Sequence, residues 1–134
     1  MTSIERARDI AQWALDLNPA ALPEAAITQA KHLVLDTISC AIAALAEEEA
    51  TSICDAVEAM GGTPQATLIG RNTKTSAAGA ALANGALLRF LDLNDFLMDN
   101  NNGASIGGHP SDNIGPALAV AEWQDVSGLE TIGA

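Results

Sequence analysis

The sequence predicts an all-α protein: a helical bundle with one short extended segment. Hydrophobic residues make up 49% of the 134 residues, whereas aromatic residues make up 3% and Tyr is absent. Most of the apolar residues are small and aliphatic, which favours closely packed helices over a β-sandwich built from β-branched and aromatic residues. Apolar residues also recur at helical spacing along most of the chain. The length corresponds to about one domain.

Two helices are expected in the N-terminal part of the chain. Thr2 or Ser3, with Glu5 three residues after Thr2, forms a capping box at the start of the first helix. Pro19 ends that helix, because the residue before a proline is driven out of the helical conformation. Pro23 suits the first position of the second helix. This second helix is apolar on most sides, as expected for a helix packed inside a larger body.

A third helix is predicted over residues 47–60, because its acidic first turn suits the positive end of a helix dipole. Gly61 and Gly62 end it. The helical period then breaks. Residues 66–69 are predicted to be extended, and a turn follows at residues 70–72.

Thr75 or Ser76 caps a fourth predicted helix that continues through "SAAGAALANGALLRFLDL". Gly79 and Gly85 lie inside it, at a cost of about 1 kcal/mol each in helix propensity. Small residues that carry such a cost indicate close packing against another helix or another subunit.

A long loop is predicted over residues 99–108, where periodicity is lost and Asn and Gly dominate; loops of this length often carry function. Asp112 or Asn113 is expected to cap a fifth helix. Ser127 and Glu130 form a second capping box for a sixth. Only four residues follow Glu130, which leads us to expect that the chain is the first part of a longer helical domain.

The composition excludes several classes of function. The net charge of −11 would be repelled by nucleic acid and by an anionic membrane surface, so neither is expected as a partner. The sequence contains no signal peptide, no membrane-length apolar run, no phosphate-binding glycine motif and no metal-ligand cluster. Cys40 and Cys54 are predicted to be buried free thiols in a reducing cytoplasm. We expect no metal and no cofactor.

The candidate site consists of Asp92, Asp95 and His109, the titratable groups that flank the long loop. A carboxylate close to an imidazole orients the ring and prepares it for general acid–base work. Pro110 biases His109 to an extended backbone, and the amides that follow could receive an anion. The competing interpretation is structural: the two carboxylates cap the loop, and His109 satisfies loop backbone groups.

Three blocks of sequence carry a resemblance to a known family: "VLDTISCAIAAL", "ATLIGRNTKTSAAGAALANGAL" and "LRFLDLNDF…GGHPSDNIGPALAVAE". Together they resemble the MmgE/PrpD family, whose members include 2-methylcitrate dehydratases, cis-aconitate decarboxylases and epimerases. The "D-x-N-D" segment followed by "HPSDN" is most similar to the dehydratases. Family members are longer homodimers that need no cofactor, with a helical domain and an α+β lid domain. The resemblance implies that residues 1–134 are the N-terminal portion of the helical domain, without the downstream helices and the lid.

The resemblance also implies roles for particular residues. His109 and Asp92 correspond to catalytic positions, and Asp95 and Ser111 are assigned to substrate binding. Phe96 stands where the family pattern usually has Thr, so that hydroxyl is missing. The expected substrate is a di- or tricarboxylate, which needs cationic partners. The loop contains no Lys or Arg, and the resemblance implies that the missing cations and histidines lie in downstream sequence.

The predicted function is therefore that of a cofactor-independent lyase that removes water from a 2-methylcitrate-like hydroxy-polycarboxylate. A base removes a proton next to a carboxylate, and an acid assists departure of the hydroxyl group. A decarboxylase or an epimerase on the same scaffold is the nearest alternative. A further alternative, of a different class, is a truncated, non-catalytic helical dimerisation domain. A homodimer is expected, because a chain this apolar would otherwise expose a large patch.

Overall fold

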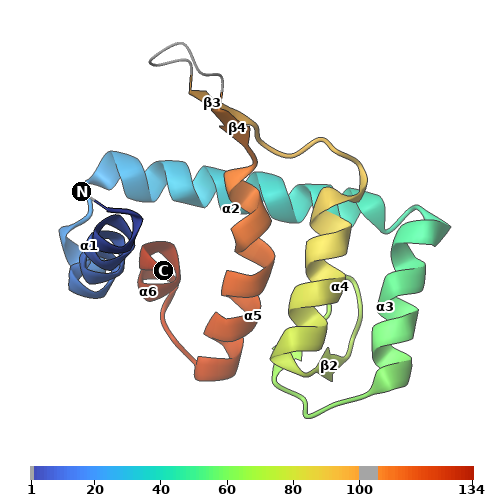
Figure 1. Cartoon of the computed structure of the whole chain (residues 1–134). Coiled ribbons are helices and arrows are strands. Elements are labelled where there is room, and N and C mark those ends of the chain that lie inside the picture. The colour runs from blue at the N-terminus through green and yellow to red at the C-terminus, as the bar shows by residue number, and fades with distance from the viewer. Residues whose placement is uncertain (1, 100–105) are drawn as a thin grey trace.

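The computed structural model describes residues 2–99 and 106–134, and this part of the chain is mainly helical (Figure 1). The helices are α1 (Ser3–Asp16), α2 (Glu24–Ala44), α3 (Glu48–Met60), α4 (Ala77–Phe90), α5 (Ile114–Gln124) and α6 (Gly128–Gly133). Two short 3-10 helices are η1 (Pro19–Ala21) and η3 (Pro110–Asn113). The strands are β1 (Ala66–Thr67), β2 (Lys74–Thr75), β3 (Leu97–Asp99) and β4 (Ile106–Gly108). The predicted all-α fold class is confirmed.

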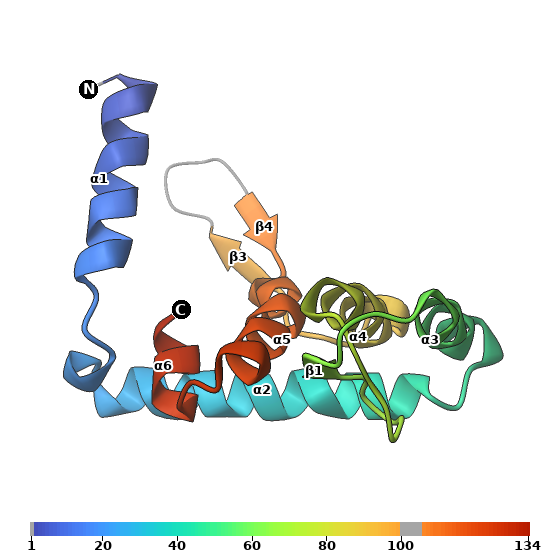
Figure 2. The ribbon, with the colours of Figure 1, turned by 90° about the horizontal axis from the view of Figure 1, so that it is seen from below.

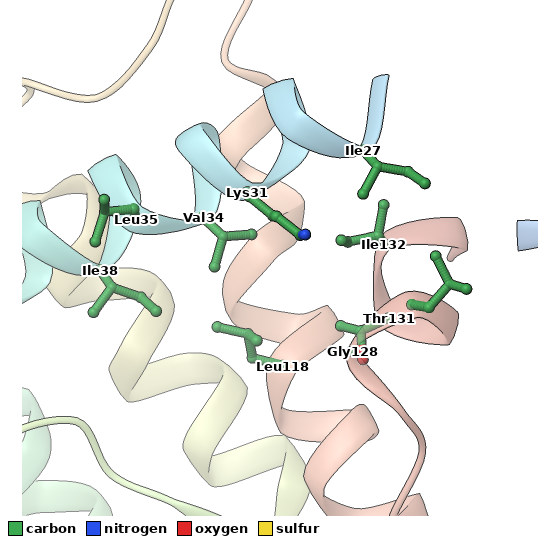
Figure 3. A pocket seen from close by; sticks show the side chains of 10 residues that line it. Ile27, Lys31, Val34, Leu35, Ile38, Leu118, Gly128, Thr131 and Ile132 are labelled. Atoms are coloured by element: carbon green, nitrogen blue, oxygen red, sulfur yellow. The ribbon is translucent and has the colours of Figure 1, made fainter. Parts of the chain in front are cut away.

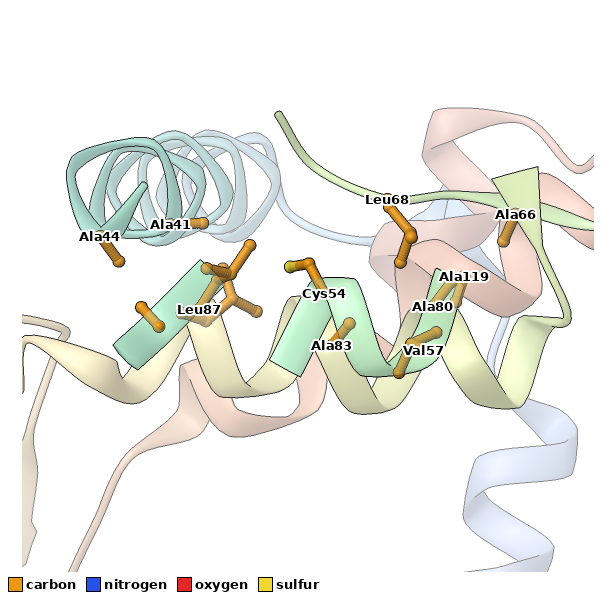
Figure 4. Close-up of a cluster of buried hydrophobic side chains, with 12 residues drawn as sticks. Ala41, Ala44, Cys54, Val57, Ala66, Leu68, Ala80, Ala83, Leu87 and Ala119 are labelled. Atoms are coloured by element: carbon orange, nitrogen blue, oxygen red, sulfur yellow. The ribbon is translucent and has the colours of Figure 1, made fainter. Parts of the chain in front are cut away.

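Helix α4 lies at the centre of the core, packed against α2, α3 and α5 (Figures 1 and 4). Large side chains in the core include Leu68, Leu87 and Val57, each at most 1% exposed. The rest of the buried cluster is largely alanine. Alanine brings helix backbones close together, which explains how a chain poor in aromatic residues still forms a dry interior. The two cysteines are buried and free, as predicted.

Glycines allow close helix contacts, as the sequence predicted for Gly79 but not for the side-chain position of Gly85. A Cβ atom on Gly115 of α5 would lie 2.9 Å from Cδ1 of Leu88 and 3.2 Å from the backbone N of Gly85. A Cβ atom on Gly85 itself would meet nothing within 4 Å. A Cβ atom on Gly79 would lie 3.1 Å from Cγ1 of Val57 in α3. The close approach of α4 to α5 therefore depends on Gly115, and Gly85 contributes only its backbone.

The predicted extended segment forms an antiparallel ribbon, in which Ala66 pairs with Thr75 and Thr67 with Lys74. Asn84 of α4 fixes this ribbon to the core. Its side-chain amide donates to the carbonyl of Thr67 at 2.9 Å, and its Oδ1 accepts from the N–H of Ile69 at 2.9 Å. Asn84 is 4% exposed, so these bonds satisfy a buried polar side chain together with the backbone of the ribbon.

Glu122 of α5 holds the same ribbon from the other side. Its carboxylate accepts hydrogen bonds from the backbone N–H and the hydroxyl of Thr67, at 2.6 and 2.7 Å, and pairs with Nζ of Lys74 at 2.7 Å. Burial alone would raise the pKa of Glu122. The hydrogen bonds from Lys74 and Thr67 together outweigh burial and lower this pKa to about 2.

The predicted helix starts are largely confirmed. Thr2 and Glu5 form the capping box of α1, and Ser127 and Glu130 form that of α6. The hydroxyl of Ser76 caps α4 by accepting from the N–H of Gly79. Pro23 is the N-cap of α2, and the first helical residue is Glu24, one position later than predicted. Helix α3 ends at Gly61, which has a φ of +69°.

Two helix boundaries differ from the prediction. Helix α4 ends at Phe90 rather than continuing through Leu93, because the backbone reverses at Asp92, where φ is +52°. The turn of 3-10 helix at Pro110–Asn113 comes before α5, and the side chain of Asn113 does not cap that helix. The carboxylate of Asp112 instead faces Arg89, so neither residue is the side-chain cap that the sequence suggested.

The predicted loop over residues 99–108 is partly wrong. Leu97, Met98 and Asp99 pair antiparallel with Gly108, Gly107 and Ile106, so the two ends of the segment form the ribbon β3–β4. The described residues thus form two extended ribbons, whereas the sequence predicted a single extended segment. Strands of three residues, one of which (Ile106–Gly108) has two glycines, are too short to show the apolar alternation that would reveal them. Residues 100–105, including the Asn run, lie outside the described residues.

Helix α1 stands away from the other helices (Figure 2). Within the described part of the chain none of its residues is buried, and Ile10 and Trp13 are 66% and 65% exposed. The predicted apolar face is therefore present but is not covered by the described residues. A large exposed apolar face of this kind is typical of an interaction surface.

Candidate functional site

The turn after α4 carries the first group of candidate residues. The N–H of Asp92 donates to the carbonyl of Arg89 at 3.1 Å, which closes the last turn as the chain enters the left-handed conformation. The Asp92 carboxylate lies 3.5 Å from Nη2 of Arg89 and is 75% exposed. An aspartate tolerates this backbone better than most residues do, since its short polar side chain bonds locally. The turn directs the following residues back towards α5.

His109 lies directly after β4 and before Pro110. Its Nδ1 is 2.6 Å from the backbone carbonyl oxygen of Asp95. A carbonyl oxygen only accepts, so Nδ1 carries the proton, and in the neutral ring Nε2 carries the lone pair. The side chain is half-buried. This arrangement orients an imidazole that is able to accept a proton at Nε2.

Phe96 covers one side of this imidazole. The centroids of the two rings are 5.1 Å apart, with planes tilted by 59°. Phe96 also lies over Gly107, where an added Cβ would come within 2.4 Å of the phenyl ring. The ribbon β3–β4 thus brings a 57% exposed aromatic ring against the candidate base. Phe96 stands where the resemblance placed a threonine hydroxyl, so the site has an apolar surface next to His109.

A series of hydrogen bonds connects α4 to the His109 segment. Arg89 donates from Nη1 to Oδ1 of Asn94 at 2.9 Å, and Asn94 donates from Nδ2 to Oγ of Ser111 at 2.7 Å. The N–H of Ser111 donates to Oδ1 of Asp95 at 3.2 Å. Arg89 also places Nε 3.3 Å from Oδ1 of Asp112. These contacts join residues 92–95 to residues 109–112, and we call this set the Arg89 network.

The structure brings three of the four predicted site residues into direct contact. Asp95 binds His109 through its carbonyl and Ser111 through its carboxylate. Ser111 is 1% exposed, so its hydroxyl faces the interior and bonds Asn94. Asp92 lies at the same turn but contacts Arg89, and the orienting contact to His109 comes from Asp95. The assigned catalytic and substrate-binding roles stay predictions.

Sequence reasoning missed Arg89 and Asn94. Arg89 lies in the last turn of α4, with the carboxylates of Asp92 and Asp112 and the amide of Asn94 around it. The spacing of Arg89 and Asp92, three residues apart at a helix end, is the signal that was available. Asn94 offers no such signal, because its buried position depends on how the turn packs against η3.

The site is acidic in the part of the chain that the structure describes. Arg89 is balanced by Asp92 and Asp112, and Asp95 adds a further carboxylate. A substrate with several carboxylates therefore needs cations other than Arg89. No group of three or more His, Cys, Asp or Glu side chains is placed to bind a metal ion within residues 2–99 and 106–134.

An apolar groove lies elsewhere in the molecule, between α2, α5 and α6. Figure 3 shows Val34 and Ile38 of α2, Leu118 of α5 and Ile132 of α6 around a space of about 550 Å³. Lys31 is the one charged residue among those that line it. None of the predicted site residues lines the groove, and it has no paired acid and base. It is therefore distinct from the candidate site.

Comparison with known proteins agrees with the resemblance of the sequence blocks. The MmgE/PrpD N-terminal domain matches residues 8–134. A mitochondrial 2-methylcitrate dehydratase of Yarrowia lipolytica is 34% identical over 109 residues, covering 78% of this chain and 20% of that protein. The 2-methylcitrate dehydratase of Cupriavidus necator is 33% identical, covering 70% of this chain and 19% of that protein.

A relative that is named for a different activity also matches. The cis-aconitate decarboxylase-like protein oryM of Aspergillus oryzae is 29% identical over 133 residues, covering 91% of this chain and 26% of that protein. The chain thus spans about a fifth to a quarter of the length of these curated relatives. In the described residues, no helix is both long enough and apolar enough to cross a membrane. On the match over residues 8–134, the chain belongs to the MmgE/PrpD family.

Proposed function

We propose that the protein to which this chain belongs is a cofactor-independent lyase that dehydrates a 2-methylcitrate-like hydroxy-polycarboxylate. The observation that carries the proposal is the bond from Nδ1 of His109 to the carbonyl of Asp95. It leaves Nε2 of an oriented, half-buried imidazole free to accept a proton. Histidine is the side chain that most often transfers protons in general acid–base catalysis.

In this reaction Nε2 of His109 removes the proton from the carbon next to a substrate carboxylate. The electron pair forms the new carbon–carbon double bond as the hydroxyl group leaves from the adjacent carbon. The hydroxyl departs as water after taking a proton from an acid. Asp92, exposed at the same turn, is proposed to contact the substrate, and Asp95 and Ser111 are proposed to shape its binding site.

The cations that bind the substrate carboxylates are proposed to come from sequence outside this chain. The support is the acidic balance of the site, in which Arg89 is paired with Asp92 and Asp112. On this proposal, residues 1–134 supply the base and its support, as the N-terminal portion of the helical domain. Further helices and an α+β lid domain complete the site.

A decarboxylase is the second candidate, and the similarity to the cis-aconitate decarboxylase-like protein favours it. Both reactions pass through a carbanion-like intermediate next to a carboxylate. In dehydration the imidazole of His109 removes the proton whose loss generates this carbanion. In decarboxylation the loss of carbon dioxide generates it, and the protonated imidazole would donate a proton to it. The two reactions differ in product. Dehydration releases water and forms an alkene, whereas decarboxylation releases carbon dioxide.

The test is turnover of 2-methylcitrate and citrate, followed as alkene absorbance, together with carbon dioxide release from cis-aconitate. His109→Ala is compared with His32→Ala, which removes the other histidine from an exposed position on α2. His109→Ala is expected to lower kcat by a factor on the order of 100 or more, because general acid–base catalysis contributes that much. His32→Ala should leave kcat unchanged. Equal activity of the two variants would refute the role of His109.

The same assay separates an enzyme from a non-catalytic helical domain. Turnover by the purified chain would establish a complete site, formed within one copy or across two. Absence of turnover by the chain, with turnover by the longer protein that contains it, would place the missing groups outside residues 1–134. Absence in both would favour a domain that only packs and dimerises.

A homodimer in the cytoplasm is also part of the proposal. Its support is the set of large apolar side chains exposed on α1 and α2, among them Trp13, Leu35 and Ile42. Burial of such side chains between two copies would remove them from water. Sedimentation at micromolar concentration tests this, and a monodisperse monomer would refute it. Cell fractionation tests the location, for which the mitochondrial relative is the alternative.

A further inference from the structure

The geometry points to Arg89 as a positioning residue for His109: it holds the Asp92–Asp95 turn against η3 and so fixes the tautomer and orientation of the imidazole. The inference rests on the proposed function for its catalytic consequence. Its structural part stands independently on the contacts of the Arg89 network.

Arg89 contacts both segments that form the site. Nη1 donates to Asn94 and Nη2 faces Asp92, both in the turn after α4. Nε faces Asp112, in the 3-10 turn after His109. A guanidinium has donors in a fixed planar arrangement, so a single side chain sets the spacing of these groups. Because α4 is part of the buried core, the base of the side chain is itself firmly held.

The path from Arg89 to His109 passes through groups shielded from solvent. Asn94 and Ser111 are 8% and 1% exposed, and the bond between them is buried. The N–H of Ser111 then holds the carboxylate of Asp95, and the carbonyl of Asp95 accepts from His109. If Arg89 is lost, Oδ1 of Asn94 loses the one hydrogen-bond donor that it has among residues 2–99 and 106–134. The cost of an unsatisfied buried polar atom would favour rearrangement of the turn.

Movement of the turn would displace the carbonyl of Asp95 from Nδ1 of His109. The imidazole would then no longer be held with its proton at Nδ1, and Nε2 would carry the proton in part of the population. An imidazole protonated at Nε2 presents a donor where the proposed reaction needs an acceptor. Arg89 is therefore expected to affect catalysis by setting which ring nitrogen of His109 carries the proton, without contact to substrate.

The primary experiment records side-chain nitrogen-15 spectra of His109, which distinguish the Nδ1–H from the Nε2–H tautomer of the neutral ring. Arg89→Met removes the donors and keeps an apolar stem. Arg71→Met is the matched control, because Arg71 also pairs with two acidic residues, Asp55 and Glu58, in a different part of the fold. The wild type and Arg71→Met should show mainly Nδ1–H. Arg89→Met should lower the Nδ1–H to Nε2–H ratio about fivefold, the effect of losing one ordinary hydrogen bond.

Arg89→Lys keeps a charge on a similar stem and guards against a variant that fails to fold. It should be folded by circular dichroism and give a tautomer ratio between those of the wild type and Arg89→Met. An unchanged ratio in both folded variants would overturn the inference. So would a wild type with mainly Nε2–H, since the bond from Nδ1 to Asp95 would then be absent.

Kinetics give the second measurement. Arg89→Met is expected to lower kcat about tenfold while KM changes by less than about twofold, because the proton-accepting group is misoriented rather than substrate binding lost. An unchanged kcat in an active enzyme would overturn the catalytic part of the inference and leave the proposed function standing. If no polycarboxylate is turned over by any form of the protein, the proposed function fails, while the tautomer experiment still decides the positioning role.

Discussion

Replacement of Glu122 by Gln should destabilise the fold at neutral pH and remove part of its pH dependence. Gln has nearly the same shape but no charge. It loses the ion pair with Lys74 and keeps only one acceptor for the two donors of Thr67. These contacts connect α5 to the ribbon β1–β2, which are far apart in sequence. Their loss should therefore be seen in global unfolding rather than in fraying of one helix.

The magnitude follows from the pKa of Glu122, which falls from its ordinary 4.5 to about 2. Without solvent screening, a pKa difference of that size corresponds to about 3 kcal/mol in the free energy of unfolding. The side chain is 33% exposed, so screening reduces this to about 1.5 kcal/mol. Because the pKa in the folded state is lowered, this stabilisation is fully present above about pH 5. It is lost as the pH falls from about 4.5 towards 2.

The assay is urea unfolding followed by circular dichroism at several pH values between 7 and 2.5. At pH 7 the urea concentration at the midpoint of unfolding should be about 1 M lower for Glu122→Gln than for the wild type. The free energy of unfolding falls by about 1.5 kcal/mol per M urea. The two curves should converge as the pH approaches 2. Asp9→Asn, which neutralises an exposed carboxylate in the interior of α1, is the control and should follow the wild type. A Glu122→Gln midpoint that parallels the wild type at every pH would refute the reasoning.

Three further predictions concern packing, capping and thiol chemistry. Gly115→Ala should lower the free energy of unfolding by about 1 to 3 kcal/mol in thermal melts, because the added Cβ overpacks the contact with α4. Gly85→Ala, with open space at its Cβ, should be neutral or stabilising. A Gly85→Ala variant less stable than Gly115→Ala would contradict the packing argument. Ser76→Ala should lower the free energy of unfolding by about 1 kcal/mol in the same melts by removing the α4 cap. An unchanged melting temperature would show that this cap does not stabilise the fold. Burial raises the pKa of the Cys40 and Cys54 thiols, so alkylation at neutral pH should be slow until urea unfolds the protein; rapid labelling of the folded chain would show that the core opens.

Local sequence signals predicted the helices well because their causes are local. The capping boxes at Thr2 and Ser127 satisfy amides three residues away, and Gly61 ends α3 through its own backbone conformation. The alanine-rich composition indicated closely packed helices, and α4 lies at the centre of such a core. Three separate blocks of sequence, one of which contains Asp92 and His109, were together sufficient to recognise the family.

Contacts between distant residues were decided only by the tertiary structure. Asn84 and Glu122 satisfy the β1–β2 ribbon across 15 or more residues, and no local pattern marks them as its partners. The pairing of β3 with β4 was missed because strands of three residues, one of them with two glycines, are too short to show periodicity. At the site, the sequence named Asp92, Asp95 and His109. The fold decided that a backbone carbonyl rather than a carboxylate orients His109, because a carbonyl belongs to every residue and its position depends on the path of the chain.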